Sequence, residues 1–109
     1  MNNSPIAFIV GGSSGMGLST AKKLVAQGIN IIILGNNRDK LTAAKSELKG
    51  LAISSATVES IQANLYEQKE VDRVIERLNN EQRHIKYFVN AAGYFNPKPF
   101  LEHQLNDYD

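Results

Sequence analysis

Hydrophobic and polar positions alternate along the chain between strand-like and helix-like patterns. Four short strand-like runs are Ile6–Val10, Ile29–Leu34, Glu59–Asn64 and Ile85–Asn90. The first two runs are apolar throughout, which is typical of strands buried on both faces of a parallel sheet. The pattern therefore predicts a sheet whose centre is formed by the first half of the chain.

Between these runs, apolar residues recur at helical spacing. The three groups are Leu18, Ala21, Leu24 and Val25; Leu41, Ala44 and Leu48; and Val71, Val74, Ile75 and Leu78. Gly28 and Gly50 predict the ends of the first two helices, because glycine readily adopts the left-handed conformation that follows many helices. The short connections between alternating strands and helices predict parallel neighbours with right-handed crossovers.

Composition and charge are those of an ordinary globular protein. The 109 residues, 42% of them hydrophobic, have room for one domain. Twelve basic and eleven acidic residues give a net charge of +1, which argues against nucleic acid or a membrane as the main partner. Without cysteine there are no disulfides or thiolate sites. No signal-peptide or membrane-spanning pattern is present, so we expect a cytoplasmic protein.

Glycines are concentrated directly behind the first strand-like run, in VGGSSGMGLST. The spacing G-x-x-x-G-x-G is met by Gly11, Gly15 and Gly17. The first allows a tight turn, the second lets the backbone approach a pyrophosphate, and the third permits close contact between the helix and the sheet. The helix N-terminus adds N–H donors and a positive dipole. The residues of this segment predicted to bind the cofactor are Gly11, Ser13, Ser14, Gly15, Met16 and Gly17.

Other interpretations of this loop fit less well. Gly12 and Gly17 have the glycine spacing of a Walker A loop, but Leu18 stands where that loop needs a lysine. The ordinary pattern G-x-G-x-x-G fits only from Gly15 onward and lacks its third glycine. A glycine–serine turn without a ligand remains as the alternative.

In this glycine segment and in a second motif near residue 90, the chain resembles the short-chain dehydrogenase/reductase family. The family's TGxxxGxG loop is matched with Val10 in place of threonine, and its NNAG motif is matched by Asn90, Ala91, Ala92 and Gly93. The resemblance covers the whole chain. It implies a doubly wound α/β fold with strand order 3-2-1-4 and an oxidoreductase that moves hydride between NAD or NADP and a small alcohol or carbonyl substrate.

The end of the second strand-like run bears on the choice of cofactor. An Asp or Glu usually holds the ribose 2′-hydroxyl there, but this chain has Asn36, Asn37 and Arg38. We assign the nearest carboxylate, Asp39, to the next helix. A 2′-phosphate would meet no repulsion, and Arg38 could reach it, which favours NADP over NAD. The alternative is that Arg38 is a solvated side chain at the helix start.

Near the end of the third strand the family often places an Asp that holds the adenine amino group. The matching residue is Asn64, followed by Leu65, and we expect both to contact the adenine. The alternative is that Asn64 caps the next helix.

The pattern Y-x-x-x-K of the family's catalytic helix occurs at Tyr94–Lys98. We interpret it as a coincidence, because Pro97 prevents a regular helix and the family's catalytic helix follows a fifth strand that bears a serine. We therefore expect no catalytic residue and no metal ligand set in this chain. The catalytic Ser and Tyr-x-x-x-Lys are expected beyond Asp109.

Residues 1–109 are thus predicted to be the N-terminal part of a single dinucleotide-binding domain, inactive alone. Its fourth strand would have a bare edge, so we expect self-association into a homo-oligomer or poor stability. Two alternatives stay open, namely a dinucleotide sensor without catalysis and an interaction module with an empty loop.

Overall fold

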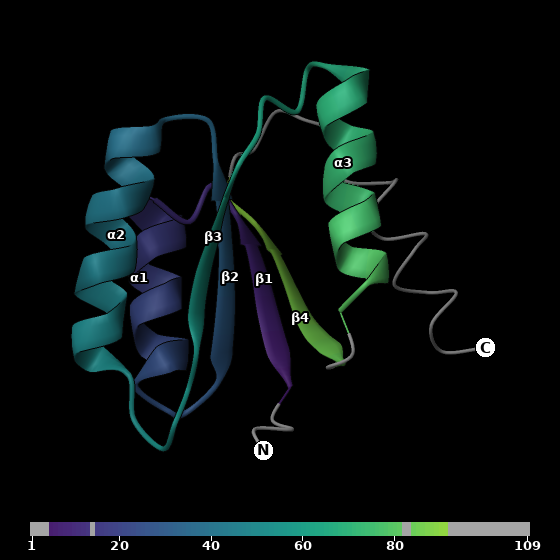
Figure 1. Cartoon of the computed structure of the whole chain (residues 1–109). Coiled ribbons are helices and arrows are strands. Elements are labelled where there is room, and N and C mark those ends of the chain that lie inside the picture. Colours follow the sequence, from purple (N-terminus) through teal and green to yellow (C-terminus); the bar gives the residue numbers. More distant parts are fainter. Residues whose placement is uncertain (1–4, 14, 82–83, 92–109) are drawn as a thin grey trace.

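The computed structural model describes residues 5–13, 15–81 and 84–91. Four parallel strands form one sheet, with helices on both faces (Figure 1). The elements are β1 (Ile6–Val10), α1 (Gly15–Val25), β2 (Asn30–Gly35), α2 (Arg38–Leu51), β3 (Val58–Gln62), α3 (Gln68–Asn79) and β4 (Ile85–Asn90). The strand order β3-β2-β1-β4 confirms the predicted doubly wound topology. Ser14, Ala92, Gly93 and Tyr94–Lys98 lie outside the described residues.

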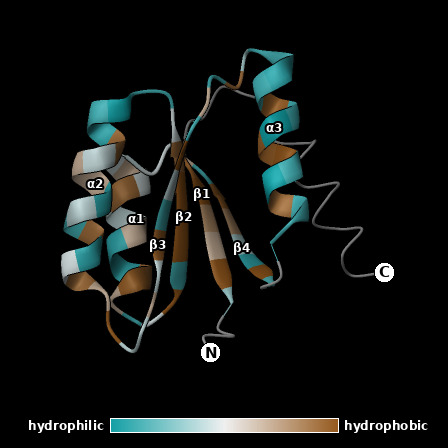
Figure 2. Cartoon of the chain, viewed as in Figure 1, coloured by the Kyte–Doolittle hydropathy of each residue, from teal (hydrophilic) through white to brown (hydrophobic). Residues whose placement is uncertain are grey.

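Helices α1 and α2 cover one face of the sheet, and α3 covers the other (Figure 1). Every residue of β1 and nearly every residue of β2 is buried, as expected for apolar strands at the centre of a parallel sheet (Figure 2). Side chains alternate between the faces. Phe8 therefore packs in the cluster under α3, while Ile9 packs in the cluster under α1 and α2.

The ends of the first two helices differ. After α1, Gly28 has φ +86°, its N–H donates to Val25 O (3.0 Å), and the Ile29 N–H donates to Leu24 O (3.2 Å). This is the Schellman arrangement that the glycine predicts. The prediction for Gly50 is wrong, because it lies inside α2. The chain leaves α2 at Ala52 in extended geometry, which needs no glycine.

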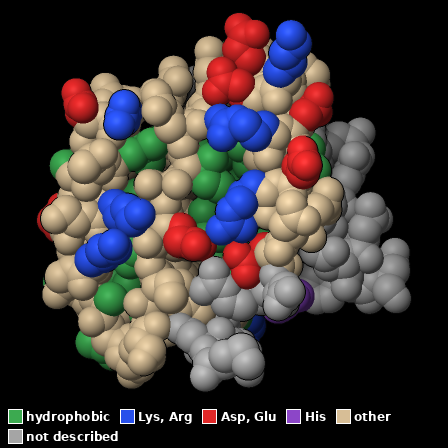
Figure 3. Space-filling model, in the orientation of Figure 1, with side chains coloured by type: hydrophobic (Ala, Val, Ile, Leu, Met, Phe, Trp, Pro, Cys, Tyr) green, Lys and Arg blue, Asp and Glu red, His purple; other side chains and the backbone are tan. Residues whose placement is uncertain are grey.

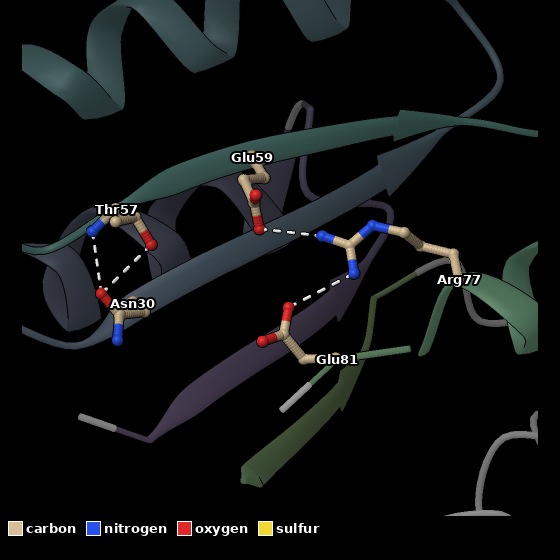
Figure 4. A network of polar contacts seen from close by, with 5 residues as sticks. All are labelled: Asn30, Thr57, Glu59, Arg77 and Glu81. Carbon is tan, nitrogen blue, oxygen red and sulfur yellow. Dashed lines mark hydrogen bonds and ion pairs between the residues drawn. The ribbon is translucent and has the colours of Figure 1, made fainter. Parts of the chain in front are cut away.

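The outer strand β3 is fixed by polar contacts to the neighbouring strand β2 and to helix α3 (Figure 4). The buried Asn30 side chain on β2 accepts hydrogen bonds from the N–H of Thr57 (2.8 Å) and from its hydroxyl (3.2 Å). On the other face, Arg77 of α3 contacts Glu59 (3.0 Å) and Glu81 (3.3 Å). Strand β3 is thus held by hydrogen bonds to β2 and by an ion pair to α3.

Within residues 5–13, 15–81 and 84–91, no helix has both the length and the apolar character needed to cross a membrane.

Candidate functional site

A cleft of about 430 Å³ lies at the carboxyl ends of β1, β2 and β3. It is lined by the glycine turn after β1, the junction of β2 and α2, the turn after β3, and Ala91, the residue that follows β4. This is the position at which open parallel α/β sheets bind ligands, where the strand order reverses. The structure therefore brings together residues from all four of the segments that the sequence indicated.

The glycine turn joins β1 to α1 at the floor of the cleft. Gly11 has φ +80°, and its N–H donates to Leu34 O of β2 (2.8 Å). Gly15 begins α1 with φ +57°, and a Cβ there would meet no atom within 4 Å. Gly15, Met16 and Gly17 thus belong to the first turn of the helix rather than to a loop before it. The backbone at Gly15 is open to a ligand in the cleft.

Gly17 serves packing rather than access. A Cβ at this position would lie 2.2 Å from Gly11 O and 3.0 Å from the Ala91 Cβ. The N–H of Ala91 in turn donates to Val10 O (2.9 Å). Ala91, in the second motif, therefore lies beside the glycine turn. Asn90 ends β4 but is not among the described residues that line the cleft.

The junction of β2 and α2 forms the second wall. Asn36 and Asn37 both line the cleft. Asn37 is also the N-cap of α2, with its side-chain Oδ1 accepting the N–H of Lys40 (3.0 Å). Lys40 lines the cleft too, although sequence reasoning did not single it out. Arg38 begins α2 and is not among the described lining residues, and Asp39 lies in the first turn of α2 as expected.

The turn after β3 forms the third wall. Asn64 and Leu65 line the cleft, together with Tyr66, which is 70% exposed. Asn64 does not cap α3, since Glu67 occupies the N-cap position. Instead its Oδ1 accepts the Tyr66 N–H (3.0 Å), and its own N–H donates to the Glu70 carboxylate (2.9 Å). The sequence signal for Tyr66 is a large aromatic residue just past a strand end.

The chemistry of the lining fits a dinucleotide. None of the described lining residues is acidic, and Lys40 is the one charged residue among them. The N-terminus of α1 borders the cleft, so its first N–H groups can reach a pyrophosphate beside the open position at Gly15. No group of three potential metal ligands occurs among the described residues. His84 precedes β4, at the opposite end of the sheet from the cleft.

Comparisons with known proteins agree with this geometry. The short chain dehydrogenase family pattern matches residues 5–109. The chain is 32% identical over 102 residues to 2,3-dihydro-2,3-dihydroxybenzoate dehydrogenase of Bacillus subtilis, covering 94% of this chain and 37% of that protein. It is 33% identical over 110 residues to 3-hydroxyacyl-CoA dehydrogenase type-2 of Bos taurus, covering 94% and 40%.

Among solved structures, the L-sorbose reductase of Gluconobacter frateurii, complexed with NADPH and L-sorbose, superposes with a TM-score of 0.73. It is 26% identical, and the match covers 86% of this chain and 35% of that one. The chain spans less than half the length of the curated relatives it matches, between 37% and 44% for the two named above and an uncharacterized oxidoreductase of Staphylococcus haemolyticus. With this fold, this cleft and this family pattern, the chain belongs to the short chain dehydrogenase family of oxidoreductases.

Proposed function

We propose that this chain holds the adenosine and pyrophosphate half of a cofactor site in an enzyme that transfers hydride between NADP(H) or NAD(H) and an alcohol or carbonyl. The observation that carries the proposal is the cleft at the strand ends, with the open backbone of Gly15 at its floor. The bound nicotinamide supplies the hydride. The residues of this chain bind and orient the cofactor.

The first turn of α1 receives the pyrophosphate, because its N–H groups and the positive end of the helix dipole favour an anion. Asn64 and Leu65 contact the adenine at the third wall. Asn36, Asn37 and Lys40 surround the adenine-side ribose at the second wall. NADPH should bind at least as well as NADH, since no described lining residue would repel a 2′-phosphate.

We assign no catalytic group to residues 1–109, which form the N-terminal part of one dinucleotide-binding domain, and expect no carbonyl reduction from this chain alone. Among the described residues β4 pairs only with β1, which supports the predicted self-association. The cytoplasmic location stays a prediction.

Light scattering after size-exclusion chromatography tests the self-association, and an NADPH oxidation assay with carbonyl substrates tests the inactivity. If turnover occurs, Tyr94→Phe is the first variant to examine.

Calorimetric titration of the purified chain with NADPH and with NADH tests the cofactor site. Both should bind, and Gly15→Val should abolish binding, because its side chain would fill the open floor of the cleft and would strain the backbone at φ +57°. Gly50→Val is a control for the added side chain, since a Cβ there also meets no atom within 4 Å but lies away from the cleft. Circular dichroism checks that the strained Gly15→Val variant is folded. A folded chain that binds neither dinucleotide would overturn the proposal.

A further inference from the structure

We infer that Glu70 of α3 is a positioning residue for the dinucleotide, because its carboxylate holds the turn that forms the third wall of the cleft. The inference rests on the proposed function and goes beyond it by assigning a role to a residue outside the cleft. Glu70 is not among the described residues that line the cleft, whereas Asn64, Leu65 and Tyr66 of the turn are. Its effect on a ligand therefore passes through the turn.

Asn64 is the residue at which α3 and the turn meet. Its backbone N–H donates to the Glu70 carboxylate (2.9 Å), and its backbone carbonyl accepts the Glu67 N–H (3.0 Å). Its side-chain Oδ1 accepts the Tyr66 N–H (3.0 Å). Of these three bonds only the one to Glu70 involves a charge, and such bonds are about twice as strong as neutral ones. Removal of the carboxylate therefore releases the turn at its first residue.

The position of Glu70 on α3 explains its reach. Glu67 is the N-cap of α3, so Glu70 stands at the position from which a glutamate in a capping box reaches back to the N-cap N–H. Here Asn64 already binds that N–H, and the half-buried Glu70 carboxylate reaches three residues further back. The positive end of the helix dipole favours a carboxylate in this turn.

Arg73, one turn further along α3, braces the same contact. Its guanidinium lies 3.6 Å from the Glu70 carboxylate and donates to Gln62 O at the end of β3 (2.6 Å). The Gln62 side chain in turn donates to Asn36 O in the second wall (3.4 Å). Residues from one turn of α3 thus fix the chain just before the third wall and at its first residue.

The charge of Glu70 also sets a requirement on position 64. An aspartate at this position could still accept the Tyr66 N–H, so the turn itself would tolerate it. It would, however, place a second negative charge near the Glu70 carboxylate, and like charges at short distance repel one another. The neutral Asn64 avoids this repulsion while it keeps the hydrogen bond to Glu70.

Calorimetric titration of the purified chain with NADH, which lacks the 2′-phosphate, tests the role of Glu70. The variants are Glu70→Ala, Glu70→Gln, Asn64→Asp and the double variant that combines Asn64→Asp with Glu70→Gln. Glu76→Ala, at an exposed position of the same helix, is the matched control. Circular dichroism checks that each variant is folded.

We expect Glu70→Ala to weaken NADH binding about tenfold and Glu70→Gln to retain most of it, because the amide oxygen still accepts the Asn64 N–H. Asn64→Asp should also weaken binding about tenfold, and the double variant should recover most of this loss, because only one negative charge remains. Glu76→Ala should bind like the unchanged chain. A merely structural role of Glu70 would not produce recovery on a second substitution.

The inference is overturned if Glu70→Ala or Asn64→Asp binds NADH like the unchanged chain, or if the double variant binds no better than Asn64→Asp alone. In each of these cases the dinucleotide site itself would stand. If Glu70→Ala is not folded, the comparison of Asn64→Asp with the double variant decides, because both keep an acceptor for the N–H of residue 64. A folded unchanged chain that does not bind NADH would overturn the proposed function together with the inference.

Discussion

The two faces of the sheet hold their helices in different ways. On the face of α1 and α2, contact is close. The backbone of α1 approaches Gly11 so nearly that only glycine fits at position 17. The small residues Ala21 and Ala44 are buried in the same cluster. Here the helices are held by direct apolar packing.

On the other face, α3 leaves a hollow of about 630 Å³ between itself and β3. Figure 3 shows hydrophobic side chains at the bottom of a depression bordered by charged ones. Two arginines of α3 span this gap, with Arg73 donating to Gln62 O (2.6 Å) and Arg77 reaching Glu59. Beside this hollow, α3 packs closely on the sheet through Val71, Val74 and Leu78, which belong to the cluster that contains Phe8.

The difference shows that one sheet can be covered in two ways. Where the helix backbone touches the sheet, the absence of a side chain is the critical feature. Where the helix stands off the outer strand, long charged side chains make the connection, and each such contact contributes little because water competes for it.

Phe8→Ala should have the largest effect on stability. The ring is fully buried and packs edge-on against Phe88 at a centroid distance of 5.6 Å. Its loss should lower the free energy of unfolding by about 3–5 kcal/mol, measured by urea denaturation. The half-buried Phe88→Ala should cost clearly less. Equal costs would mean that the core under α3 is not centred on β1.

Gly17→Ala tests the close face. The added Cβ would meet the Gly11 carbonyl, which is backbone and cannot rotate away. We expect a loss of about 1–3 kcal/mol in urea denaturation, together with weaker dinucleotide binding. Gly50→Ala on α2 is the control and should stabilise the chain by up to about 1 kcal/mol, because its Cβ points into open space. A neutral Gly17→Ala would refute the close-contact interpretation.

Arg77→Met should have a small effect, about 1 kcal/mol or less, since the arginine side chain is 36% exposed. The loss should shrink as salt is added. Lys22→Met removes the more exposed ion pair with Glu47 on the other face and should be nearly neutral. Thermal unfolding at low and high salt measures both. A larger cost for Lys22→Met would remove the contrast between the faces.

The fold could be predicted from the sequence because buried strands and amphipathic helices leave periodic patterns of apolar residues. Ile6–Val10 and Ile85–Asn90 coincide with β1 and β4, and β2 and β3 differ by one or two residues at their ends. The role of Gly17 could also be predicted from the spacing of the glycines, because Gly17 and the Gly11 carbonyl that it approaches are only six residues apart in the sequence. The predicted end of α2 was wrong by one residue. The chain leaves this helix in an extended conformation, which does not need a glycine.

The walls of the cleft were harder to predict. Lys40 was missed because its contribution depends on the rotation of a helix relative to the sheet, which a charge pattern does not report. The contacts of Arg77 with Glu59 join residues 18 positions apart through long side chains. Such pairings depend on the distance between α3 and β3, which is a property of the folded chain.

The hydrogen bonds between Asn30 and Thr57 fix the register of β3. They pin Thr57 beside the start of β2, and pairing then proceeds from Ile31 with Val58 to Gly35 with Gln62. A slip of one residue would turn Glu59 toward the apolar cluster under α2 and separate it from Arg77. Because a strand transmits its alignment along its whole length, this buried amide also determines where Asn64 arrives at the cleft. A contact at the amino end of the sheet thus sets the position of the third wall of the cleft at the carboxyl end.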